Sequence, residues 1–146
     1  MILAANPFIA LLAGAFVFLV IFLLIILVIY ILYLLTLQNA LKRVSVGNRT
    51  ISPGNVWLML IPIFNIIYAF ILYPKISESL KNEFESRNNP QSGDYAKTLG
   101  IVNAAGGPVN IIFQFIPFLG IFTSLAIFVI WIVYWAKISG LKNKLQ

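Results

Sequence analysis

The pattern of hydrophobic and polar positions divides the chain into long apolar segments that are separated by short polar loops. From Phe8 to Leu37 the sequence is apolar throughout, apart from Thr36. A helix of this length measures about 45 Å, whereas the hydrocarbon core of a bilayer is about 30 Å thick. We therefore expect a first transmembrane helix over residues 8–37, which must tilt or protrude from the bilayer.

A second apolar segment, residues 56–73, predicts another transmembrane helix, and Pro62 within it should produce a kink. The polar segment that follows, residues 75–87, predicts an amphipathic helix. Its large apolar side chains recur every fourth residue, at Ile76, Leu80 and Phe84. This helix would either lie on the membrane surface or pack beneath the transmembrane helices.

The last apolar stretch, residues 95–136, is too long for a single crossing, and Pro117 predicts a turn within it. We expect two helices, over residues 95–115 and 118–136. The first of these is unusually polar and contains Gly106-Gly107-Pro108, so it requires neighbouring helices to satisfy its backbone.

The distribution of Lys and Arg favours four transmembrane segments over three, because four give the clearer excess of basic residues on one side. With four segments, one side carries only the three basic residues of the first loop, Lys42, Arg43 and Arg49. A weak internal repeat agrees with four segments, since Ile61-Pro62-Ile63-Phe64 resembles Ile116-Pro117-Phe118-Leu119. Lys-Ile-Ser occurs further along after each copy, at residues 75–77 and 137–139, with a longer gap in the second copy. Four segments place both termini in the cytoplasm.

Composition supports a membrane location. Hydrophobic residues make up 61% of the 146 residues, charged residues only 10%, and the mean hydropathy is +0.98. The net charge of +6 suits anionic lipid headgroups. Nucleic acid is not expected as a partner, because base-stacking aromatic side chains do not alternate with the basic residues.

Several short motifs resemble a family of small bacterial inner-membrane proteins. They are Val56-Trp57-Leu58, Ile61-Pro62, Phe64-Asn65, Ser79-Leu80-Lys81 with Glu83, Ile116-Pro117-Phe118, Tyr134-Trp135 and Lys137-Ile138. The resemblance implies four membrane spans and a location in the bacterial inner membrane. It implies no activity and no functional residues.

Residues able to perform catalysis are scarce. The chain contains neither His nor Cys, and no acidic residue falls inside a predicted span. This removes the commonest general base, the usual zinc ligands and an intramembrane proton relay. We therefore expect no enzyme activity, no metal site and no cofactor.

Two sets of residues inside the predicted spans are candidates for a role. The uncharged polar set is Asn65, Asn103, Asn110 and Gln114, and the small set is Ala10, Gly14, Gly106 and Gly107. The polar side chains either hydrogen-bond between helices, which we favour, or line a polar pathway. The small residues predict close contact between helices.

The sequence thus predicts an all-α, polytopic transmembrane helix bundle with four spans, three being possible, and one cytoplasmic amphipathic helix. The favoured function is non-enzymatic association, as a small accessory subunit of a larger membrane complex or as a homo-oligomer. The alternative is a small channel or passive transporter with a polar pathway along the third span. A membrane enzyme is the least favoured class.

Overall fold

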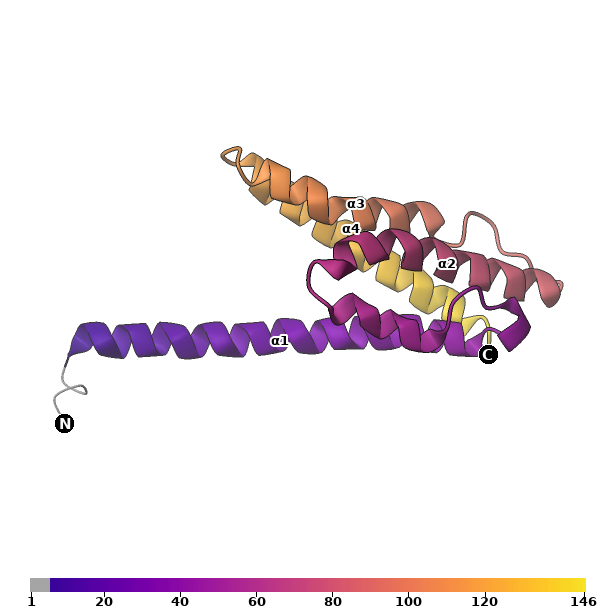
Figure 1. Ribbon diagram of the computed structural model, residues 1–146, viewed down its shortest axis with the longest axis horizontal. Coiled ribbons are helices and arrows are strands. Elements are labelled where there is room, and N and C mark those ends of the chain that lie inside the picture. Colours follow the sequence, from indigo (N-terminus) through magenta and orange to yellow (C-terminus); the bar gives the residue numbers. More distant parts are fainter. Residues whose placement is uncertain (1–5) are drawn as a thin grey trace. The chain divides into compact units, whose positions relative to one another are not determined.

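The computed structural model describes residues 6–146, which are helical and contain no β-strand. The α-helices are α1 (Pro7–Arg43), α2 (Phe64–Ser86), α3 (Lys97–Phe113) and α4 (Leu119–Asn143), and the 3-10 helices are η2 (Val46–Asn48) and η3 (Pro53–Leu60) (Figure 1). The predicted all-helical fold is therefore confirmed. Among the described helices, α1 and α4 are long and apolar enough to cross a membrane. The chain forms two compact units, residues 1–33 and 34–146.

In the first unit, α1 presents apolar side chains around its whole circumference. Nearly every large side chain from Phe8 to Leu32 is exposed. Ala10 is also exposed, and a Cβ atom built on Gly14 would have no neighbour within 4 Å. A soluble monomer rarely exposes a continuous apolar patch of this extent.

The last part of α1 belongs to the second unit and contributes to its core. Leu34, Leu37 and Leu41 are fully buried there, at spacings that place them on one face of the helix. The predicted transmembrane span ends at Leu37, together with the hydrophobic run. The helix continues to Arg43 because this face packs against protein, so a single apolar stripe is sufficient.

The segment predicted as a second transmembrane helix, residues 56–73, is instead a helical hairpin. The 3-10 helix η3 ends at Leu60, the chain reverses around Pro62, and α2 begins at Phe64 (Figure 1). Proline has no N–H to continue a helix and disfavours helical backbone in the residue before it. Ile61 is accordingly extended (φ −78°, ψ 113°), so the prediction of one kinked helix is wrong.

The predicted amphipathic helix, residues 75–87, is not a separate element but the second half of α2, which passes through Pro74 without a break. Its predicted apolar face is confirmed, since Ile76, Leu80 and Phe84 are each fully buried. Of the two placements left open by the sequence, packing against other helices is therefore correct.

The predicted division of residues 95–136 into two helices is confirmed by α3 and α4. Helix α3 runs without interruption through Gly106-Gly107-Pro108. Helix α4 extends seven residues beyond the predicted end at Ala136, to Asn143. It continues because Ile138 and Leu141 are buried in the core of the second unit.

The internal sequence repeat corresponds to a repeated turn. Ile63 and Phe118, the residues after the two prolines, both have a positive φ, of 66° and 65°. In each turn the second residue after proline donates its N–H to the proline carbonyl, over 2.7 Å from Phe64 to Pro62 and 2.8 Å from Leu119 to Pro117. Helices α2 and α4 therefore begin at turns of the same geometry.

Candidate functional site at the charged end of residues 34–146

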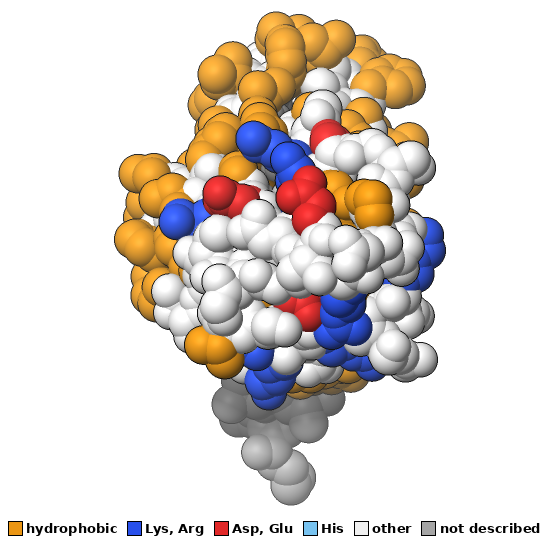
Figure 2. All heavy atoms as spheres, turned by 90° about the vertical axis from the view of Figure 1, so that its right-hand side faces the viewer, with side chains coloured by type: hydrophobic (Ala, Val, Ile, Leu, Met, Phe, Trp, Pro, Cys, Tyr) orange, Lys and Arg blue, Asp and Glu red, His pale blue; other side chains and the backbone are white. Residues whose placement is uncertain are grey.

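Hydrogen bonds bring both loops and the C-terminal segment to one end of the second unit. The Ser45 N–H in the first loop donates to Glu83 on α2 over 2.8 Å, and Arg43 Nη1 donates to the Lys142 carbonyl over 2.6 Å. Arg87 Nη1 also reaches the Leu145 carbonyl at 3.4 Å. We call this region the charged end, and Figure 2 shows the basic and acidic side chains that gather there.

Basic residues from the first loop, the helix ends and the C-terminal segment meet at the charged end. Lys75 Nζ contacts the Thr50 carbonyl, Lys137 pairs with Asp94 and Lys144 Nζ donates to Gln91. The predicted separation of the first-loop basic residues from the other seven is therefore wrong. The sequence could not reveal this, because it does not show that the chain between the two loops doubles back.

The centre of the charged end is Glu83, whose side chain is 1% exposed. Its carboxylate accepts hydrogen bonds from the Ser45 N–H and Oγ, at 2.8 and 2.9 Å, and from Asn48 Nδ2 at 2.8 Å. Arg87, one helical turn further on, contributes Nε at 2.9 Å and Nη2 at 2.8 Å. This single carboxylate therefore joins the first loop to α2.

These contacts alter the acidity of Glu83. Burial by itself raises the pKa of the carboxyl, but the hydrogen bonds from Asn48, Ser45 and Arg87 together outweigh it and lower the pKa from 4.5 to about 2. The group is therefore ionised at any physiological pH. A carboxylate with all its partners supplied by the chain serves as a structural anchor, because a general acid or base needs a pKa near the working pH.

Arginine side chains close the carboxyl ends of helices at the same place. Arg49 Nε donates to the Leu41 and Val44 carbonyls at 2.9 and 2.8 Å, and its Nη2 donates to the Lys42 carbonyl at 2.9 Å. Leu41 and Lys42 lie in the last turn of α1 and Val44 directly follows it, where the regular hydrogen bonds of the helix end. The positive charge also interacts favourably with the helix dipole. Arg43 likewise donates to the Lys142 carbonyl in the last turn of α4.

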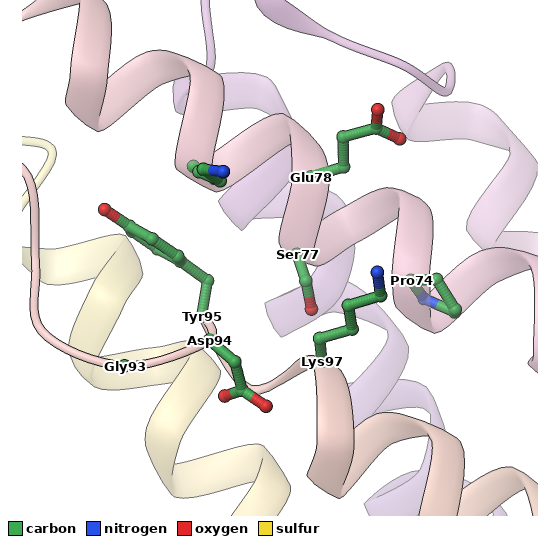
Figure 3. A pocket seen from close by; sticks show the side chains of 8 residues that line it. Pro74, Ser77, Glu78, Gly93, Asp94, Tyr95 and Lys97 are labelled. Carbon is green, nitrogen blue, oxygen red and sulfur yellow. The ribbon is translucent and has the colours of Figure 1, made fainter.

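A groove of about 410 Å³ opens beside α2 and the start of α3 (Figure 3). Its charged lining residues are Glu78, Lys81, Asp94 and Lys97, and Ser77 lies between them. Asp94 is occupied as the cap of α3, since it accepts the Ala96 and Thr98 N–H groups at 3.1 and 2.7 Å. Lys81 pairs with Glu85 outside the groove at 3.7 Å. The groove is thus polar, with much of its charge already paired.

Within residues 6–146, no three acidic side chains lie close enough to form a metal site. The carboxylates of the charged end are divided between helix capping, the Glu83 cluster and exposed ion pairs. The arrangement joins helices and loops.

Two of the four polar residues predicted inside the spans, Asn103 and Asn110, form hydrogen bonds between helices. Asn103 Nδ2 on α3 lies 3.5 Å from the Tyr73 hydroxyl on α2, and Asn110 Oδ1 accepts from Thr123 and Ser124 of α4 at 2.8 and 3.1 Å. The other two are Asn65, half-buried near the start of α2, and Gln114, exposed beside the turn between α3 and α4. The set does not converge on one cavity.

Of the two predicted small residues on α3, Gly106 lies at a close contact between helices and Gly107 does not. A Cβ atom on Gly106 would lie 2.9 Å from Ile127 of α4, so close contact between helices is confirmed there. Gly107 has open space instead. The closest approach is at Gly100, where a Cβ atom would lie 2.6 Å from the Tyr73 Cβ. Gly100 is not among the predicted residues, although its spacing from Ala104 is the small-xxx-small pattern that favours such contact.

In comparisons with protein-family models, curated proteins and solved structures, nothing matches this chain. The resemblance to small bacterial inner-membrane proteins therefore stays a prediction. The function must be inferred from the geometry described above.

Proposed function

We propose that this chain is a non-enzymatic integral membrane protein that acts by association, as a small accessory subunit or as a homo-oligomer in the bacterial inner membrane. The observation that carries the proposal is the use of the intramembrane polar groups. Asn103 and Asn110 are engaged between helices, which is the role expected of polar side chains that stabilise a membrane bundle. A channel would need them to face a water-filled pathway.

The basic residues support a membrane orientation. Since basic residues of the first loop, the helix ends and the C-terminal segment meet at the charged end, that end would face the cytoplasm, in agreement with the excess of Lys and Arg on the cytoplasmic side of membrane proteins. The loops and the C-terminal segment would lie there together. This orientation agrees with the predicted cytoplasmic placement of the C-terminus.

Helix lengths favour three crossings over the four expected from the sequence. Helix α1 is long enough for one crossing. From Lys97 to the turn at Phe115, α3 and its extension rise about 27 Å, and α4 rises about 27 Å from Leu119 to Lys137. These lengths approach the hydrocarbon thickness of about 30 Å. Helices α3 and α4 would therefore cross the membrane as a pair.

The exposed part of α1 offers a surface for association. Ala10 and Gly14 lie one turn apart on one face, with open space above Gly14. Small residues at this spacing allow two membrane helices to approach closely. A partner helix, from a second copy or from another protein, would pack against this face.

The experiment is extraction in a mild detergent followed by native mass measurement and identification of co-purifying proteins. We expect a discrete complex larger than the 16.3 kDa monomer. Ala10→Leu should reduce its amount, and Ala15→Leu, which makes the same change about 140° around the helix, should not. A strictly monomeric protein would contradict the proposal. Flux that is lost on Asn103→Ala or Asn110→Ala would favour the channel instead.

A further inference from the structure

We propose that residues 53–75, here called the first hairpin, insert into only the leaflet on the charged side and contact its acyl chains without crossing the bilayer. The inference rests on the membrane location proposed above and adds the partner and depth of this segment. Both ends of the hairpin lie at the charged end. Thr50 Oγ1 donates to the Lys75 carbonyl over 2.9 Å, and the Thr50 N–H donates to Ser79 Oγ over 2.9 Å.

The two arms of the first hairpin are equally long. The eight residues of η3 rise about 16 Å, at about 2.0 Å per residue of 3-10 helix. Helix α2 rises about 17 Å between Phe64 and Lys75. Each arm therefore reaches about half of a hydrocarbon core of about 30 Å, which places the turn at Pro62 near the middle of the bilayer.

The tip of the first hairpin is suited to hydrocarbon and unsuited to water. Ile61, Ile63 and Phe64 are 48%, 79% and 44% exposed. No charged residue occurs between Pro53 and Pro74. Such a tip would be unfavourable in water and favourable among acyl chains, at about 25 cal/mol for each Å² of apolar surface removed from water.

The backbone of the hairpin also meets the requirement of a membrane interior. Hydrocarbon cannot satisfy backbone N–H and C=O groups, so an inserted segment must pair its own. Helix η3 does this through 3-10 hydrogen bonds, and it contacts α2 with Val56 and Met59 buried. The backbone groups of the hairpin are thereby paired within the hairpin itself.

The second hairpin, residues 97–137, provides an internal reference for depth. It has the same turn geometry, but 20 residues separate Pro117 from Lys137, whereas 13 separate Pro62 from Lys75. The seven additional residues add about 10 Å and nearly two whole turns of helix, so the buried faces keep their direction. Ile76 and Ile138, each directly after its lysine, are both fully buried. Figure 1 shows the second hairpin extending further from the charged end.

The absence of cysteine from the natural sequence makes a direct test possible, because a single introduced thiol is unique. Three variants of the full chain are reconstituted in phosphatidylethanolamine and phosphatidylglycerol vesicles: Ile63→Cys, Phe118→Cys and, as a water-exposed control, Val46→Cys, whose residue is 80% exposed in the first loop. Each thiol is tested with a membrane-impermeant maleimide on intact and permeabilised vesicles. A bimane label on the thiol then reports depth through quenching by lipids with nitroxides at different positions.

We expect the Val46→Cys thiol to react with the impermeant maleimide and the Ile63→Cys thiol to be unreactive from both sides. The bimane at position 63 should be quenched most by nitroxides near the bilayer centre, and the label at position 118 should lie about 10 Å from it, toward the far surface. Reaction at position 63 from either side, or equal depths of the two labels, would overturn the inference. Release of the whole protein by alkaline carbonate would instead contradict the membrane location itself.

Discussion

Replacing Glu83 should separate the structural role of the charged end from the general effect of removing a surface charge. Glu83→Ala leaves the Ser45, Asn48 and Arg87 donors without their shared acceptor in a buried position. The depressed pKa, about 2 against 4.5, corresponds to about 3 kcal/mol of stabilisation. Removing one partner of a buried ion pair lowers the free energy of unfolding by a similar amount, about 3–5 kcal/mol.

Thermal unfolding in detergent, followed by tryptophan fluorescence, measures this loss. At about 3 °C per kcal/mol for a chain of this size, Glu83→Ala should lower Tm by about 10 °C. The matched control is Glu85→Ala, which removes the same charge from the same helix. Glu85 pairs with Lys81 at 3.7 Å, and both side chains are more than half exposed, so its loss should cost less than about 1 kcal/mol.

The pH dependence gives a second, independent measure. Because the pKa of Glu83 is lower in the folded protein, its stabilisation is fully present above about pH 4.5 and is lost as pH falls toward 2. The natural chain should therefore lose stability in this window, and Glu83→Gln should lose less. The reasoning is refuted if the variants at positions 83 and 85 have the same Tm, or if the Gln variant retains the full acid dependence.

The remaining predictions concern helix contacts and capping. Gly100→Ala should destabilise the fold by about 1–3 kcal/mol, because the added Cβ would lie 2.6 Å from the Tyr73 Cβ. Gly107→Ala on the same helix should be neutral or slightly stabilising, because a Cβ there meets open space. Unfolding in denaturant compares the stability of the two variants. Asp94→Ala should cost about 1 kcal/mol by removing the cap of α3, and faster hydrogen exchange of the first α3 amides would report it. Asn110→Ala should lower stability by about 0.6 kcal/mol and leave vesicle permeability to small solutes unchanged.

The sequence by itself predicted the all-helical fold and most of its helices. Long apolar runs and a scarcity of charge predict membrane helices because hydrocarbon requires apolar side chains and internally paired backbone. The spacing of Ile76, Leu80 and Phe84 predicted a buried face correctly, since helical periodicity is a local property. Pro117 likewise predicted the turn between α3 and α4. The repeated Ile-Pro motifs mark two turns of the same geometry, although the sequence predicted only a kink at the first of them.

Only the tertiary structure decided which ends of these elements meet. The same Pro62 could kink a helix or reverse it, and hydropathy has the same value for a crossing helix and for a hairpin that returns. The hydrogen bonds between Ser45 and Glu83, 38 residues apart, decide between them, because they require both ends of the intervening segment to lie on one side. Contacts at that separation depend on how the whole chain packs. Local sequence patterns do not specify them.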